Sequence, residues 1–298
     1  MHSHLRLARI HWAYERFVPK EFLMLLGKED IIDLGIGEHQ ELEMAVLFAD
    51  IRNFTAYSER LGSRKTFDLL NRVFDRLSPV VQKHGGFVDK YIGDALMALF
   101  PSPGKQCLAC IVEIFQELEA HNRVYAEEYG EVEIGIGLHC GSLVVGTVGT
   151  SERMDTTVIS DTVNVASRIE GTTKMFGVRA LISEPFVRMV CETEEEEEER
   201  GREKEEGEKD SGFAMRWVGE VKLKGKKDRM GLYELLACYG EEKRRGLAEV
   251  DLQEVLFSGK NGAMHEEAPE RVRELEAQYP QDSVVRYYKE SLGQDNNG

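Results

Sequence analysis

The stretch GGFVDKYIGDALMALF, residues 85–100, decides the fold of this chain. It contains two runs rich in β-forming residues, 87–92 and 95–100, and only Gly93 and Asp94 separate them. Two strands joined by two such residues form a tight antiparallel hairpin. We therefore expect a hairpin that presents Asp94 at its tip.

Regular elements surround this hairpin on both sides. The apolar run 44–51 predicts a strand, and 63–83 predicts a helix with Ser63 as its N-cap, because apolar residues recur there at helical spacing. Beyond the hairpin, 105–129 predicts a second helix and 132–140 a further strand. The order βαββαβ is the ferredoxin-like motif, so the sequence predicts an α+β fold with a ferredoxin-like core.

Further strands and helices extend this core. We expect a hairpin partner over 143–148, a strand over 155–159 and a helix over 161–176. Two closing strands, 213–223 and 230–236, flank a basic turn in an otherwise acidic chain. Together these elements predict one catalytic domain over residues 43–240.

The two ends of the chain differ from this domain. Residues 1–42 form a lead-in with an amphipathic stretch, predicted to be helical, that either pairs with a second copy or packs on its own domain. Residues 241–298 form a polar tail with helical periodicity, and its segment from Glu274 resembles one unit of a helical repeat. A single repeat cannot bury its own apolar face, so the tail is expected to dock on the domain or on a partner.

Charge is concentrated in one short segment. The chain carries a formal net charge of −16, which argues against nucleic acid as a partner. Residues 192–212 hold much of this charge and few apolar residues, so we expect an acidic disordered insertion. A regulatory role of this segment stays open.

Neither a membrane span nor a secretory signal is predicted. The longest apolar runs, such as 44–49 and 95–100, are strand-sized, whereas a bilayer helix needs about 20 residues. Five scattered cysteines do not form a disulfide framework, and the CxxC of Cys107 and Cys110 lies in a predicted helix without a second ligand pair. The sequence therefore predicts a cytoplasmic protein with reduced thiols.

Asp50 and Asp94 are the first candidate site residues. The first and third strands of a ferredoxin-like sheet are antiparallel neighbours, so the end of the first strand lies beside the start of the third. Two carboxylates held this close repel each other unless cations lie between them. Mg²⁺ together with a phosphate suits such a pair, although acidic loop residues taken singly are common.

Two cationic features could serve a phosphate. Asn164 and Arg168 are four residues apart on the helix 161–176 and share one of its faces. The turn KLKGKKDR, which begins at Lys222, would attract a triphosphate. Each feature by itself is also what a solvated surface would show.

Four ordered motifs resemble the successive signatures of class III adenylyl and guanylyl cyclases. They are MAVLFADIRNFT from Met44, GGFVDKYIGDALMALF from Gly85, IGIGLHCGSLVVGTVG from Ile134 and DTTVISDTVNVASRIEG from Asp155. The resemblance spans about residues 43–236 and implies the class III nucleotidyl cyclase fold. It further implies conversion of ATP into 3′,5′-cyclic AMP and pyrophosphate.

The resemblance also implies roles for single residues. Asp50 and Asp94, with the Ile51 carbonyl, would bind two Mg²⁺ or Mn²⁺ ions. Asn164 would orient the ribose, Arg168 would stabilise charge on the α-phosphate, and Lys224 would hold the β- and γ-phosphates.

Lys90 and Thr157 fall at the positions that read the purine. Guanylyl cyclases typically carry Glu and Cys there, whereas a Lys donor suits the acceptor N1 of adenine. The resemblance thus implies an adenylyl-type enzyme. Ser160, where the family more often has glycine, departs from the pattern beside Thr157.

Family sites lie between subunits, with Asp50 and Asp94 from one chain and the other site residues from its mate. This chain carries both sets, so a symmetric homodimer is expected. The lead-in from Arg16 resembles the region downstream of sensor domains, which implies an upstream sensor domain or a separate regulatory partner. Two alternatives stay open: a guanylyl cyclase, which Lys90 disfavours, and an inactive nucleotide-binding regulatory module, which the retained Asp and Arg residues disfavour.

Overall fold

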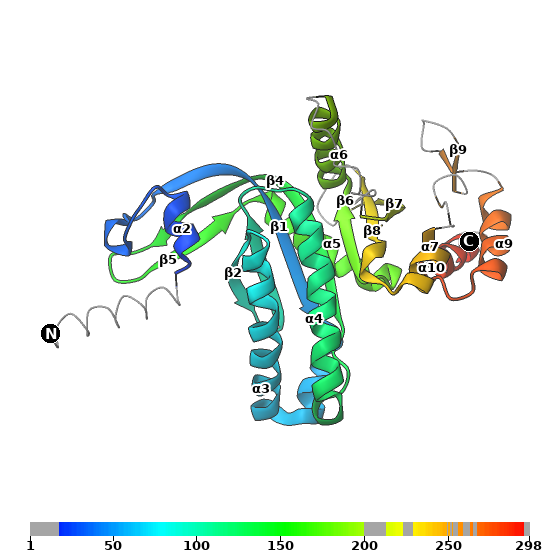
Figure 1. Cartoon of the computed structure of the whole chain (residues 1–298), viewed down its shortest axis with the longest axis horizontal. Helices are drawn as coiled ribbons and strands as arrows, with labels where there is room; N and C mark the ends of the chain where they lie inside the picture. The colour runs from blue at the N-terminus through cyan, green and yellow to red at the C-terminus, as the bar shows by residue number, and fades with distance from the viewer. Residues whose placement is uncertain are drawn as a thin grey trace.

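An eight-stranded sheet forms the centre of the part of the chain that the structure describes. The computed structural model describes residues 18–199, 213–222, 229–248, 250, 252, 256–258, 263–264 and 267–294. The strand order is β2-β3-β1-β4-β6-β8-β7, and β5 pairs with β4 away from this path. Helices cover both faces of the sheet (Figure 1).

The predicted ferredoxin-like core is confirmed. Its six elements are β1 (His39–Ile51), α3 (Phe54–Lys83), β2 (Phe87–Ile92), β3 (Ala95–Phe100), α4 (Lys105–Tyr129) and β4 (Ile134–Gly149). Strand β1 pairs antiparallel with both β3 and β4. Helices α3 and α4 lie side by side on one face of the sheet, where Leu47, Leu69 and Ile111 are fully buried (Figure 1).

Three boundaries differ from the prediction. Strand β1 begins at His39, and β4 runs unbroken to Gly149 where two separate strands were expected. Strand β1 pairs with β4 along its whole length, from His39↔Gly146 to Ile51↔Ile134, so backbone pairing continues where the apolar pattern has stopped. Helix α3 begins at Phe54, and a break at Gly62, with φ of 72°, hides its first section from a periodicity argument.

One strand and one helix between α5 and β7 were not predicted. Strand β6 (Ala180–Ser183) has only four residues, all buried, and helix α6 (Glu184–Glu199) follows it directly. The first eight residues of the segment predicted to be disordered, 192–199, thus continue a helix, consistent with the high helix propensity of glutamate. Residues 200–212 lie outside the described residues.

The second face of the sheet carries α5 (Asp161–Phe176) and the short helix α2 (Lys20–Leu25). Phe22 and Ala166 pack there against Val46 and Phe48 of β1. Ser160 caps α5, because its Oγ accepts from the Thr162 N–H at 2.9 Å. Of the amphipathic stretch in the lead-in, residues 1–17 lie outside the described residues.

The remaining elements extend the sheet and form the tail. Strand β5 (Met154–Ile159) pairs with β4, and β7 (Met215–Val221) pairs with β8 (Met230–Leu235). After η2 (Leu236–Cys238) the chain continues through α7 (Glu241–Ala248), β9 (Phe257–Ser258), β10 (Ala263–Met264), α9 (Ala268–Gln278) and α10 (Ser283–Gln294). The tail docks on the domain itself, through a second apolar core shared with α5, β7 and β8.

Two predictions about the chain as a whole can be compared with the structure. None of the described helices is long and apolar enough to cross a bilayer. Cys107 and Cys110 lie fully buried in the core on α4, and burial raises the pKa of both thiols. Their CxxC spacing therefore serves packing in this fold.

Gly137 allows α5 to lie directly on the sheet. A Cβ at this position would lie 2.3 Å from the Glu170 backbone nitrogen and 2.7 Å from the Ala166 carbonyl oxygen. Backbone atoms cannot turn away as a side chain can, so Gly137→Ala must push the helix outward.

We expect Gly137→Ala to lower the free energy of unfolding by about 1–3 kcal/mol or more, as overpacking does. Urea denaturation followed by circular dichroism measures it. Gly171→Ala is the matched control, because a Cβ there meets nothing within 4 Å and alanine favours the helix. Equal stabilities of the two variants would contradict this close approach.

Candidate active site

Asp50 and Asp94 meet at one edge of the sheet. The β1–β3 register pairs Asp50 with Ala95, and Asp94 precedes Ala95 in the β2–β3 turn. Burial, together with a hydrogen bond to Asp50 and the negative charge of Asp50, raises the pKa of Asp94 to about 6. The structure thus holds two carboxyl groups close enough to resist simultaneous ionisation, and a cation between them would relieve this.

A lysine that the sequence analysis did not single out pairs with Asp50. The Lys174 Nζ lies 3.0 Å from the Asp50 Oδ2, and Lys174 stands in the last turn of α5. Helix α5 therefore brings positive charge to the end of strand β1, although the two residues are 124 positions apart.

Arg52 ties the segment after β1 to the end of α5. Its guanidinium donates to the Thr173 Oγ1 at 2.7 Å and to the Val178 carbonyl at 2.9 Å. Burial lowers the pKa of Arg52, and the nearby charge of Glu170 opposes this shift. The backbone that follows Asp50 is thereby held against α5.

Glu170 is a third carboxyl group behind this pair, and sequence reasoning missed it. It is 6% exposed, and its Oε1 has no hydrogen-bond partner among the described residues. Burial raises its pKa to about 7, and the negative charge of Asp50 adds to the shift. One signal was available, because Glu170 follows Ile169 and lies one turn from Ala166, within the apolar face of the helix.

The raised pKa of Glu170 predicts a pH dependence of stability. A carboxyl group whose pKa is about 7 when folded and 4.5 ordinarily binds its proton more tightly in the native state. Stability is therefore lost as pH rises from about 4.5 through 7. Glu170→Gln removes this loss.

In EDTA, we expect Glu170→Gln to be more stable than the parent chain at about pH 8, by roughly 1–3 kcal/mol, with little difference near pH 5. Urea midpoints at both pH values measure this. Glu242→Gln, on the exposed side of α7, is the control. A variant that is less stable at the higher pH would show that the buried carboxylate is stabilising.

The donor set fits a hard divalent cation that a substrate also binds. Among the described residues no group of three or more His, Cys, Asp or Glu could hold a metal ion, so protein side chains alone do not complete a shell. Asp50 and Asp94 supply two carboxylates, which is the usual protein share where phosphate and water fill the remaining positions. Ile51 ends β1 and has a hydrocarbon side chain without a donor atom, so only its backbone carbonyl could be a ligand.

Asn164 and Arg168 stand on α5 but away from the carboxylate pair. Arg168 and Lys174 are six positions apart, which is about 9 Å along the helix axis and about 120° around it. Asn164 is one turn further off, and its side chain donates to the Ser160 carbonyl at 3.4 Å. Helix α5 therefore presents its end to Asp50 of its own chain, whereas Asn164 and Arg168 in its first half point in another direction.

Lys90 lies on β2 and Thr157 on β5, and charged residues on these two strands interact. The Lys90 Nζ is 3.4 Å from the carboxylate of its neighbour Asp89. Burial raises the pKa of Asp89, Lys90 lowers it, and Asp155 of β5 raises it further. Asp155 is two residues before Thr157 on the same strand face, so its effect on Asp89 shows that charges on β5 act on β2.

Lys224 lies outside the described residues, as do all of residues 223–228. Strand β7 ends at Val221 and strand β8 begins at Met230, so the basic segment connects these two neighbouring strands.

A ferredoxin-like sheet with a carboxylate pair at its hairpin edge and a polar helix beside it defines the class III nucleotidyl cyclase catalytic domain. The family model described as the adenylate and guanylate cyclase catalytic domain matches residues 37–237. The chain belongs to this family.

Three similar proteins place the chain within the family. An adenylate cyclase of Anabaena cylindrica is 36% identical over 232 residues, which cover 76% of this chain and 43% of that protein. The crystal structure of the adenylyl cyclase CyaB from P. aeruginosa is 26% identical, has a TM-score of 0.53 and covers 66% of this chain and 95% of that chain. The guanylyl cyclase Cya2 is also 26% identical with a TM-score of 0.53, over 68% and 95%.

Similarity of fold does not distinguish adenylyl from guanylyl cyclases. An adenylyl and a guanylyl cyclase match the chain equally well in structure, so the fold does not select the base. The chain spans less than half the length of the curated relatives it matches. Base preference must therefore be argued from side chains.

Proposed function

We propose that this chain is an adenylyl cyclase, which converts ATP into 3′,5′-cyclic AMP and pyrophosphate in the cytoplasm. The meeting of Asp50 and Asp94 carries the proposal, because the raised pKa of Asp94 marks a site where a cation is favoured. The similarity to curated adenylate cyclases supports the choice of reaction.

Asp50 and Asp94, with the Ile51 carbonyl, would hold two Mg²⁺ or Mn²⁺ ions. When bound, such ions lower the pKa of the ribose 3′-hydroxyl and neutralise charge on the leaving pyrophosphate. The register of β1 and β3 orients the two carboxylates before any substrate arrives.

The other site residues would bind and orient the nucleotide. Arg168 offers planar donors to the α-phosphate as charge develops there, and Asn164 fixes the ribose. Lys224 would hold the β- and γ-phosphates. Lys90 and Thr157 would read the adenine, in which N1 accepts the lysine donor.

The geometry of α5 supports a site shared between two copies. Within one chain, Arg168 is turned about 120° from the lysine that contacts Asp50. A second copy related by a two-fold axis would bring its own Arg168 to these carboxylates, and the same axis would create a second, equal site. The proposal therefore includes a homodimer, and a single chain is expected to be inactive.

A mixing experiment tests the shared site. Asp94→Ala removes one half and Arg168→Ala the other, so each variant alone should lose cyclase activity while still dimerising. When the two are unfolded and refolded together in equal amounts, mixed dimers recover one intact site, or about a quarter of the parent activity. Cyclic AMP formation measures it, and no recovery would place both residues in one chain's site.

Base selectivity depends on Lys90 in this proposal. Lys90→Glu should lower the ratio of kcat/KM for ATP to that for GTP by about tenfold or more, since glutamate suits the protonated N1 of guanine. Lys65→Glu, an equal charge change on the exposed side of α3, should leave the ratio unchanged. An unaltered ratio in Lys90→Glu would mean that the base is read elsewhere, which reopens the guanylyl alternative.

The alternative of an inactive module differs in its expected product. Such a module would bind ATP and release it unchanged, and it would not need two carboxyl groups that repel each other. Incubation of the purified chain with ATP or GTP and each metal, followed by product identification, separates the three functions.

A further inference from the structure

The C-terminal tail is built into the domain at the elements that carry the nucleotide-binding residues. The family match ends at residue 237, so α9 and α10 lie beyond it. These helices nevertheless share a core with α5, β7 and β8, in which Val272, Val284 and Val285 are fully buried. Helices α9 and α10 therefore belong structurally to the domain.

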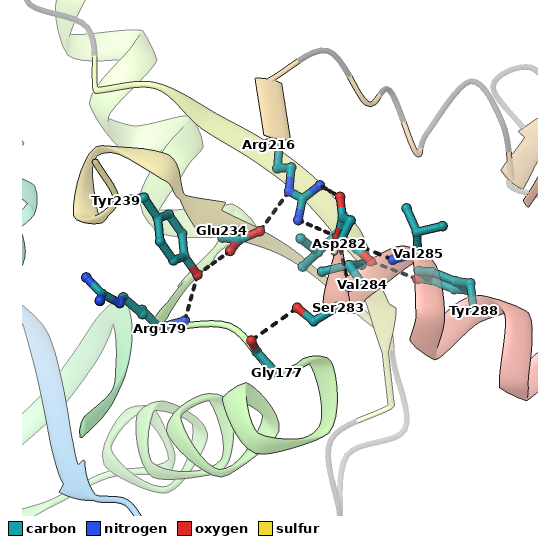
Figure 2. Close-up of polar contacts among 11 residues, drawn as sticks. Gly177, Arg179, Arg216, Glu234, Tyr239, Asp282, Ser283, Val284, Val285 and Tyr288 are labelled. Atoms are coloured by element: carbon teal, nitrogen blue, oxygen red, sulfur yellow. Dashed lines mark hydrogen bonds and ion pairs between the residues drawn. The ribbon is translucent and has the colours of Figure 1, made fainter. Parts of the chain in front are cut away.

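A buried ionic network fixes α10 to the sheet (Figure 2). Arg216 of β7 donates to the Glu234 Oε2 at 2.7 Å and, through its two terminal nitrogens, to both oxygens of Asp282. Glu234 also accepts from the Tyr239 hydroxyl at 2.6 Å. The side chains of Arg216, Glu234 and Asp282 are 6%, 1% and 2% exposed, so water does not screen these contacts.

Asp282 has a second task at the start of α10. Its Oδ1 also accepts from the backbone N–H groups of Val284 at 2.9 Å and Val285 at 3.4 Å. One carboxylate thus caps the helix and binds strand β7 (Figure 2). The helix start and the strand cannot move independently while these bonds hold.

The same turn of the chain contacts α5. The Ser283 hydroxyl donates to the carbonyl of Gly177, the residue that caps the end of α5, at 3.1 Å. Tyr287 packs edge-to-face on Phe176, with ring centroids 4.8 Å apart. The Tyr288 hydroxyl donates to the Val218 carbonyl of β7 at 2.8 Å. The tail therefore bridges the end of α5 and strand β7.

We propose that α9 and α10 act as a clamp that sets the position of α5 relative to the β7–β8 hairpin, with Asp282 as its positioning residue. Arg168 stands on α5, and residues 222–229, including Lys224, join β7 to β8. The clamp thus aligns α5, which carries the group proposed to hold the α-phosphate, with the two strands that the segment containing Lys224 connects. This inference rests on the proposed function, which assigns those two roles.

The clamp predicts an effect confined to one half of the shared site. In a mixed dimer of Asp94→Ala and Arg168→Ala chains, the intact site takes α5 and the hairpin from the Asp94→Ala chain. Asp282→Asn placed in that chain should lower cyclic AMP formation by about tenfold, as small misplacements of binding groups do. Placed in the Arg168→Ala chain, the same change should leave activity within about twofold, because that chain supplies only the metal side of the intact site, which the β1–β3 register holds in place.

Equal losses in both placements would overturn the clamp, since they would show a general effect on folding or dimerisation. Lys289→Gln is the control within the tail, because Lys289 pairs with Glu276 at the exposed side of α9 and α10. If Asp282→Asn does not fold, Tyr288→Phe, which removes one hydrogen bond to β7, takes its place in both arms.

A binding measurement separates this proposal from the proposed function. In the unmixed chain, Asp282→Asn should weaken binding of a fluorescent ATP analogue by about tenfold. Mn²⁺ binding, followed by electron paramagnetic resonance, should not change, because the register of β1 and β3, which the clamp does not contact, holds Asp50 and Asp94. If the mixture of Asp94→Ala and Arg168→Ala chains, without a change at Asp282, recovers no activity, the shared site is refuted. If nucleotide affinity is unchanged in Asp282→Asn, only the clamp is refuted.

Discussion

The repulsion between Asp50 and Asp94 is the constraint on which the candidate site depends. Two carboxyl groups are held together because β1 and β3 pair in one register, and a shift of this register by one residue would turn one of them to the other face. The positive charge of Lys174, which pairs with Asp50, partly offsets this repulsion. Arg52 holds the backbone that follows Asp50, and Glu170 adds a third acidic group close by.

This electrostatic arrangement explains why α5 is central to both halves of the proposed site. Its end supplies Lys174 to the carboxylates of its own chain, and its first half presents Arg168 in another direction. Gly137 permits the close packing that holds both ends in place, because any side chain there would meet the helix backbone. Helix α5 therefore contributes to the metal side of one proposed site and to the nucleotide side of the other.

Much of the core could be predicted from the sequence because its signals are local. The β2–β3 hairpin and helices α4 and α5 have the bounds that their turn residues and apolar spacing indicate. Local sequence patterns did not predict elements whose formation depends on residues distant in the sequence. Strand β4 continues because β1 pairs with it, and β6 is too short to show a period. Lys174 and Asp50 are 124 positions apart, and no local pattern connects them.

The tail illustrates the same limit and shows what a buried charge can add. Apolar contacts between α10 and the sheet would favour docking without choosing one position, since they are not directional. The two-pronged contact of Arg216 with Asp282 is directional, and leaving either partner buried alone would cost about 3–5 kcal/mol. Arg216 and Asp282 are 66 positions apart, so their pairing could not be read from either segment. The ionic network therefore selects one register among the dockings that the apolar core allows, and in the proposed clamp this register sets β7 and β8 relative to the end of α5.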